Sequence, residues 1–155
     1  MKVHDYEKAI LITGGVVLAL CAAALAYTTL GLGMHLPGHV GQIDPAKVYQ
    51  SAPFNAPGVK KVAEGKYEVV MVAQAWAFMP AEIRVPANAE VTIIATSVDV
   101  IHGLEIERTR VNMMLIPGQI GRISHTFREP GEHLLICHEY CGTGHHMMYG
   151  KVIVE

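Results

Sequence analysis

A stretch of twelve residues near the C-terminus, CHEYCGTGHHMM at 137–148, contains two Cys, three His and two Met. Thiolate, imidazole and thioether groups are ligands that bind transition metals in proteins. Four of these residues, Cys137, Cys141, His145 and Met148, follow the spacing C-x3-C-x3-H-x2-M. The stretch therefore predicts a metal site. The remaining cysteine, Cys21, lies far upstream, and we interpret it as a small apolar residue.

Three kinds of site are compatible with this spacing. A disulfide between Cys137 and Cys141 would suit an oxidising compartment, but it leaves the His and Met unexplained. A structural zinc site would use Cys and His, and it has no need of a thioether. Copper electron-transfer sites use all three groups. A mononuclear copper site needs one Cys, whereas two thiolates held close together can bridge two copper ions and share the transferred electron between them.

A dicopper site would need a second imidazole from outside this stretch. His102, in SVDVIHGLEI, begins a predicted strand, and Asp99 comes just before it. A single His in a strand is usually structural, so the prediction that His102 is a ligand depends on the Cys-rich stretch.

The elements that must position these residues are short strands. Apolar, β-branched segments alternate with turn residues such as IPG and EPG, and little helix is expected among them. The predicted strand segments are KYEVVMVAQAWAF, AEIRVP, AEVTIIATS, HGLEIE, GRISHTF, GEHLLIC and YGKVIVE. The last two flank the stretch at 137–148, which is therefore a loop between two core strands. The pattern predicts a mainly β fold, a small antiparallel sandwich or Greek-key barrel.

The N-terminal part of the chain has a different composition. Residues 9–34 contain no charged side chain, and as a helix they would extend roughly 39 Å, enough to cross a bilayer. We predict one retained transmembrane α-helix. A cleaved signal peptide, with Ala24-Leu25-Ala26 as its cleavage site, is the alternative, but the apolar run is longer than a typical signal core. A lipoprotein signal at Cys21 would need a small residue where Leu20 stands.

Three segments follow from this division: an anchor helix at 1–36, a Pro- and Gly-rich linker at 37–62, and a β domain at 63–155. Lys2 and Lys8 precede the helix, and no Lys or Arg follows it before Lys47, which predicts a cytoplasmic N-terminus and an external domain. The net charge is −2 and no basic stripe is present, so nucleic acid is a poor candidate as a partner.

The pair of motifs SVDVIHG and CHEYCGTGHHMM, together with the turn IPGQ, resembles subunit II of cytochrome c oxidase, specifically its dinuclear copper-A domain. The resemblance covers almost the whole chain. The single N-terminal helix is similar to that of the compact B-type haem–copper oxidases. The resemblance implies a cupredoxin-like Greek-key fold and a membrane-bound electron-transfer function.

The resemblance also implies a role for individual residues. Cys137 and Cys141 would bridge two copper ions, His102 and His145 would each bind one, and Met148 and the backbone carbonyl of Glu139 would be weak ligands. Trp76 falls in the aromatic segment where electrons are thought to enter, although it could instead fill the core beneath the loop. The neighbouring residues His138, His146 and Met147 do not match the family spacing, and we expect His125 and His133 to be strand residues without a metal.

The implied activity is electron entry into a terminal oxidase on the outer, or periplasmic, face of the cell membrane. Cytochrome c would deliver an electron to the copper pair, which would pass it to the haem-containing subunit I, where oxygen is reduced and protons are translocated. A small extra subunit is possible in such a complex. The alternatives are the copper-A subunit of a nitric oxide reductase and, from a different class, a membrane-tethered copper delivery protein or a disulfide-stabilised binding module.

Overall fold

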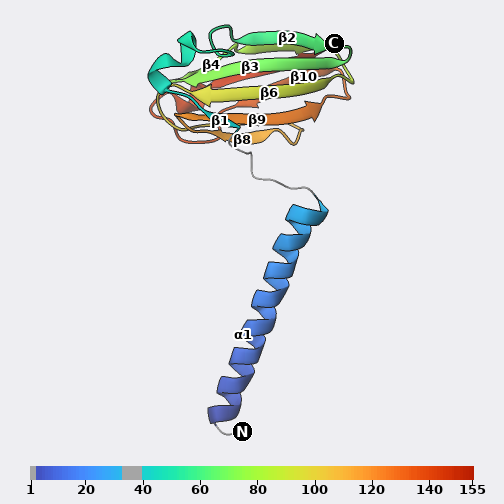
Figure 1. The fold of residues 1–155 in the computed structure, drawn as a ribbon, viewed down its shortest axis with the longest axis vertical. Helices are drawn as coiled ribbons and strands as arrows, with labels where there is room; N and C mark the ends of the chain where they lie inside the picture. Colours follow the sequence, from blue (N-terminus) through green and yellow to red (C-terminus); the bar gives the residue numbers. More distant parts are fainter. Residues whose placement is uncertain (1–2, 33–39) are drawn as a thin grey trace. The chain divides into compact units, whose positions relative to one another are not determined.

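The computed structural model describes residues 3–32 and 40–155, which divide into a helical N-terminal unit and a β domain (Figure 1). In the first unit, helix α1 (Val3–Ala26) continues into a short π-helix, η1 (Tyr27–Gly31). The helical segment His4–Gly31 contains an 18-residue window with a mean hydropathy of 2.5, and it is long and apolar enough to cross a membrane. The ends of the predicted anchor, at 1–2 and 33–36, lie outside the described residues.

The β domain consists of two sheets. In chain order, its strands are β1 (Gly41–Gln42), β2 (Gly58–Ala63), β3 (Lys66–Gln74), β4 (Ala77–Met79), β5 (Glu82–Val85), β6 (Glu90–Ser97), β7 (His102–Ile106), β8 (Asn112–Leu115), β9 (Gln119–Thr126), β10 (Gly131–Ile136) and β11 (Tyr149–Val154). One sheet has the order β1-β9-β6-β3-β2, with β4 paired to β3, and the other has the order β5-β11-β10-β7-β8. The predicted mainly β sandwich is confirmed.

Two strand pairs differ from the antiparallel arrangement that the sequence predicted. β3 pairs with β6 in parallel, and β11 pairs with β5 in parallel, whereas the other pairs are antiparallel. Parallel neighbours need a crossover between the strands, and here the chain passes from one sheet to the other between them. The two crossovers join the sheets into one sandwich.

The core lies between the two sheets and follows from the alternation of side chains along each strand. In β11, Val152 and Val154 are buried, and Ile153 between them is partly exposed. Leu104 and Ile106 of β7 likewise point into the core from the same sheet. Burying such side chains contributes roughly 1.5–3 kcal/mol each, which fixes the strand register and hence the ends of the strands that carry the metal loop.

The sequence predicted a linker at 37–62, but in the structure residues 40–62 pack onto the β domain. β2 pairs with β3 at the sheet edge, and the 3-10 helix η2 (Pro45–Gln50) begins a segment that covers the outer face. Val48 and Phe54 are almost fully buried there, against Val70, Val72 and other apolar residues. β3 is apolar on both faces, so its outer face needs this cover. Residues 37–39 lie outside the described part of the chain.

The predicted strand at 66–78 is interrupted. β3 ends at Gln74, and the chain then turns so that β4 pairs back on β3, with Val72 opposite Met79. Trp76 lies in this turn and not within a strand. The interruption places the indole ring at the end of the domain where β10 ends and the metal loop begins.

Candidate metal centre

The loop at 137–148 is held at both of its ends. Ile136 of β10 pairs with Tyr149 of β11, and the Cys137 amide donates a hydrogen bond of 3.2 Å to the carbonyl oxygen of Met148. Within the loop, Gly142 adopts a φ of 116°, in the left-handed region that favours glycine. Because two paired strands carry the ends, the loop presents its side chains from a rigid frame.

The two loop cysteines lie side by side with free thiols. Cys137 and Cys141 are each 7% exposed, and their Sγ atoms are 3.7 Å apart. A disulfide would require about 2.05 Å. Sulfur ligands that share a tetrahedral metal ion at about 2.3 Å stand near 3.7 Å from each other. The separation therefore suits two thiolates on a common metal and not a covalent bond between them.

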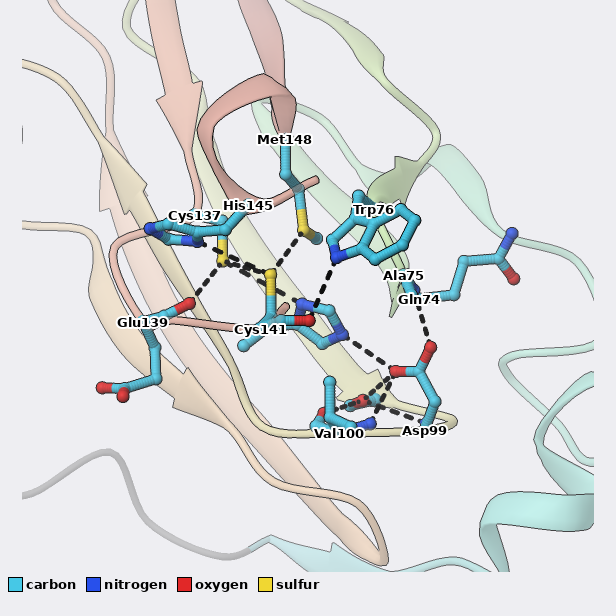
Figure 2. A network of polar contacts seen from close by, with 12 residues as sticks. Gln74, Ala75, Trp76, Asp99, Val100, Cys137, Glu139, Cys141, His145 and Met148 are labelled. Atoms are coloured by element: carbon cyan, nitrogen blue, oxygen red, sulfur yellow. Dashed lines mark hydrogen bonds and ion pairs between the residues drawn. The ribbon is translucent and has the colours of Figure 1, made fainter. Parts of the chain in front are cut away.

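Each sulfur has one imidazole nitrogen beside it. His102 Nδ1 lies 3.9 Å from Cys137 Sγ, and His145 Nδ1 lies 3.5 Å from Cys141 Sγ (Figure 2). With metal–sulfur and metal–nitrogen bonds of about 2.3 and 2.0 Å, two ligand atoms on one ion stand about 3.5 Å apart. His102, Cys137 and Cys141 alone offer three ligand atoms within 4.8 Å of one another.

Two weaker donor atoms complete the set. The carbonyl oxygen of Glu139 lies 3.2 Å from Cys137 Sγ, and Met148 Sδ lies 3.7 Å from Cys141 Sγ. The Met148 side chain is 2% exposed, so the thioether is directed into the site and away from water. The structure thus gathers the ligand atoms that the resemblance implied. The combination of thiolate, imidazole and thioether fits copper better than zinc.

The orientation of His102 is fixed by a carboxylate that the sequence analysis noted only as a neighbour. Asp99 Oδ1 lies 2.9 Å from His102 Nε2, which directs Nδ1 toward the sulfurs. Asp99 Oδ2 accepts a hydrogen bond of 2.6 Å from the Ala75 amide. Burial alone would raise the pKa of Asp99, but hydrogen bonds from His102, the Val100 amide and the Ala75 amide hold its pKa below the usual value. A charged carboxylate behind a ligating imidazole makes the other nitrogen a better ligand.

The thiol pair is electrostatically unfavourable as two thiolates without a metal. Burial, together with the hydrogen bond and negative charge of Cys137, raises the pKa of Cys141 to about 11. Two adjacent buried thiolates therefore require positive charge between them, and metal cations supply it.

Trp76 lies over the loop at the surface and not in the core beneath it. Its Nε1–H donates a hydrogen bond of 3.0 Å to the carbonyl oxygen of Cys141, and the side chain is 42% exposed. Gly142 and Gly144 lie under the ring, and a Cβ atom added at Gly144 would come within 2.4 Å of the indole. One edge of the indole thus faces solvent, while its N–H contacts the backbone of a candidate ligand.

The other His and Met residues of the loop lie outside the ligand set. His146 and Met147 are exposed. The His138 ring packs on Gly103, where any Cβ would come within 2.6 Å of it, and His138 Nε2 has no hydrogen-bond partner among the residues that the structure describes. His125 and His133 lie on β9 and β10, away from the loop.

The fold and the site together define a class: a cupredoxin-like domain with a copper-type set of ligands, carried on a chain with one candidate membrane helix. A family model described as the periplasmic domain of cytochrome c oxidase subunit II matches residues 60–155. The chain belongs to the cytochrome c oxidase subunit II family.

Individual relatives agree with this assignment. Cytochrome c oxidase subunit 2 of Thermus thermophilus is 37% identical, over 97% of this chain and 92% of that protein. A chain in a cryo-EM structure of a heme-copper terminal oxidase dimer is 35% identical, with a TM-score of 0.77 over 97% of this chain and 99% of that one. The periplasmic domain of subunit II from Bradyrhizobium japonicum, at 19% identity and a TM-score of 0.53, shares the fold, over 57% of this chain and 83% of that one.

Proposed function

We propose that this chain is the electron-entry subunit of a cytochrome c oxidase and holds a dinuclear copper-A centre. The observation that carries the proposal is the pair of buried, free thiols 3.7 Å apart, each with one imidazole nitrogen beside it. When bound, the copper pair would accept and release one electron. A mononuclear copper electron-transfer site of the usual kind would need only one of the two thiols.

These distances support the ligand assignment that the resemblance implied. Cys137 and Cys141 would hold the two ions between them, and His102 and His145 would each bind one ion. Met148 Sδ and the Glu139 carbonyl oxygen are the weak ligands. The low exposure of both sulfurs and of Met148 excludes water from the site. Excluding water reduces the solvent rearrangement that accompanies each change of charge, so the residues favour fast electron transfer.

Side chains around the site suit docking of protein partners. Exposed apolar residues flank the ligands, namely Trp76 over the loop, Val100 and Ile101 before His102, and Tyr140 and Met147 within the loop. Exposed apolar groups that gather in one area mark protein interaction surfaces. We propose that cytochrome c docks here, that its electron enters near Trp76, and that the electron leaves through His145 toward the haem of subunit I. A small extra subunit belongs to the same proposal.

The location proposed for the chain rests on its N-terminal part. The apolar helix anchors the protein in the cell membrane, and Lys2 and Lys8 place the N-terminus in the cytoplasm by the positive-inside rule. The copper domain then lies on the outer face, where an external cytochrome c can reach it. Oxygen reduction and proton translocation would occur in the partner subunit and not on this chain.

Electron paramagnetic resonance of the full chain loaded with copper tests the centre. The expected spectrum shows hyperfine splitting from two equivalent copper nuclei that share one unpaired electron. Splitting from a single copper nucleus, or a preference for zinc with no signal, would contradict the dinuclear assignment.

Purifying the chain with its membrane partners tests the complex. Cytochrome c-dependent consumption of oxygen is expected. Consumption of nitric oxide instead would indicate the nitric oxide reductase alternative. Rapid loss of copper to a chelator, with no haem partner, would indicate a delivery protein.

A further inference from the structure

A second candidate site lies at the end of the β domain opposite the metal loop. A hollow of about 640 Å³ is lined by the turn between β7 and β8, the end of β9, and the loop from β9 into β10. Strand β7 begins at His102, the candidate copper ligand, and ends at Ile106 just before this turn. The two sites are therefore separated by the length of β7, roughly 15 Å. Volumes of this size are typical of sites for small molecules.

Positive charge gathers around the hollow. Arg108, Arg110 and Arg128 are among the residues that line it. Arg108 donates a hydrogen bond of 3.1 Å to the Glu132 carbonyl oxygen, and within residues 3–32 and 40–155 none of the three arginines forms an ion pair. Arg108 also has a φ of 60°, which is uncommon for a residue with a side chain. Such backbone conformations cluster at ligand-binding sites.

Two histidines and an aromatic ring form the inner part of the hollow. His133 is 9% exposed, and its Nδ1 lies 3.2 Å from the Glu107 carbonyl oxygen, so Nδ1 is the donor. The ring of Phe127 lies between the histidines, with centroids 4.8 Å from His125 and 5.7 Å from His133. Burial, and then electrostatic repulsion from His133, Arg110 and Arg128, lower the pKa of His125. The hollow thus has a positive field that favours an anion.

We propose that this hollow binds a small ligand through its phosphate groups. Guanidinium groups form paired hydrogen bonds with phosphate oxygens, which makes arginine the preferred side chain for this chemistry. Three guanidiniums without carboxylate partners can serve more than one phosphate group. The histidine edges and the Phe127 ring can contact the remainder of the ligand. The site is independent of the copper ligands and goes beyond the proposed function.

One acidic residue tests whether the hollow prefers a negatively charged ligand. Glu129 also lines the hollow and would repel a bound phosphate. Glu129→Gln should therefore strengthen binding, whereas Arg110→Gln and Arg128→Gln should each weaken it by about tenfold or more. Arg122→Gln is the matched control, because Arg122 is exposed on β9 but does not line the hollow.

Titration calorimetry of the full chain in neutral detergent, with pyrophosphate as the probe, measures these effects at low ionic strength. A second arm replaces pyrophosphate with phosphatidylglycerol in the micelles, because a lipid headgroup carries the same phosphate chemistry. The site is supported if the affinity for either probe rises in Glu129→Gln and falls in the Arg110 and Arg128 variants. The probe that binds more tightly shows whether the ligand is a free phosphate compound or a lipid headgroup. No binding in either arm, or an equal loss in Arg122→Gln, would overturn the proposal.

Discussion

Asp99 Oδ1 lies 2.9 Å from His102 Nε2, while Asp99 Oδ2 accepts a hydrogen bond from the Ala75 amide (Figure 2). One carboxylate thus connects the candidate ligand at the start of β7 with the turn that carries Trp76. The contact that holds the imidazole on its Nε2 side therefore comes from outside the loop that carries the other ligands.

Replacement of this carboxylate should weaken metal binding. In Asp99→Asn, the amide preserves the shape but not the charge, so the His102 imidazole becomes a poorer ligand and copper affinity should fall about 10–100-fold. Competition with a copper chelator measures the change, and circular dichroism checks the fold. Asp44→Asn alters the N-cap of η2, where Asp44 contacts Ala46 and Lys47 and no candidate ligand, so this control should leave affinity unchanged. An unchanged affinity in Asp99→Asn would contradict the orienting role.

Met148→Leu should retain the copper pair and shift its reduction potential. The side chain is buried and leucine has a similar volume, so the fold should lose less than about 1.5 kcal/mol. Loss of the thioether should change the electron density at the copper ion that Met148 would contact. Potentiometric titration measures the shift, and Met147→Leu, at an exposed neighbouring position, should show none. Identical potentials in the two variants would exclude Met148 as a ligand.

Cys141→Ser should abolish the delocalised copper pair. A hydroxyl is a poor bridge between soft metal ions, so the variant should bind a single copper or none. Paramagnetic resonance and metal analysis distinguish these products from the original centre. Cys21→Ser leaves the β domain unaltered and should keep the original spectrum. Persistence of the shared-electron signal in Cys141→Ser would refute bridging by this sulfur.

Copper uptake should release protons and become tighter as pH rises. The pKa of Cys141 in the metal-free chain is about 11, so its thiol is protonated at neutral pH and must lose the proton to bind metal. Apparent affinity should therefore increase with pH up to that value and then level off. A pH indicator in weakly buffered solution counts the protons released on loading. Uptake without proton release would show that the thiols are not ligands.

Trp76→Phe should slow reduction of the copper centre by cytochrome c several-fold. Phenylalanine lacks the N–H that contacts the Cys141 carbonyl oxygen, so the connection from the exposed ring to the ligand backbone is lost. Stopped-flow mixing measures the rate, and potentiometry shows whether the centre itself has changed. Tyr149→Phe tests a second exposed aromatic residue beside the loop and should have little effect. Equal rates in all three proteins would place electron entry elsewhere.

Local spacing was sufficient to predict the candidate ligands of the loop, because Cys137, Cys141, His145 and Met148 lie within one turn-rich segment. His102 could be predicted only together with that segment, since the pairing of strands is what brings it to the loop. The part played by Asp99 in orienting His102 was missed for the same reason, although its place three residues before His102 was a usable signal. The alternation of apolar residues predicted the sandwich but not which strands pair in parallel.

Two further features depend on contacts between distant segments. The segment that contains Val48 and Phe54 is rich in Pro and Gly, so its sequence resembles a linker. Both side chains are buried because they cover the apolar outer face of β3. The arginines at 108, 110 and 128 are scattered along the sequence and show no motif. They line one hollow because the β7–β8 turn and the loop after β9 meet at the same end of the sandwich.

The hydrogen bond from the Cys137 amide to the Met148 carbonyl closes the metal loop at its base. A loop whose two ends are hydrogen-bonded to each other can change its length or its side chains without disturbing the strands that support it. Five of the six candidate ligands, the Glu139 carbonyl among them, belong to that loop, and only His102 belongs to the scaffold. Transplanting the loop onto another sandwich with a histidine at the corresponding strand end should carry the copper chemistry with it, so that the site and the scaffold can evolve separately.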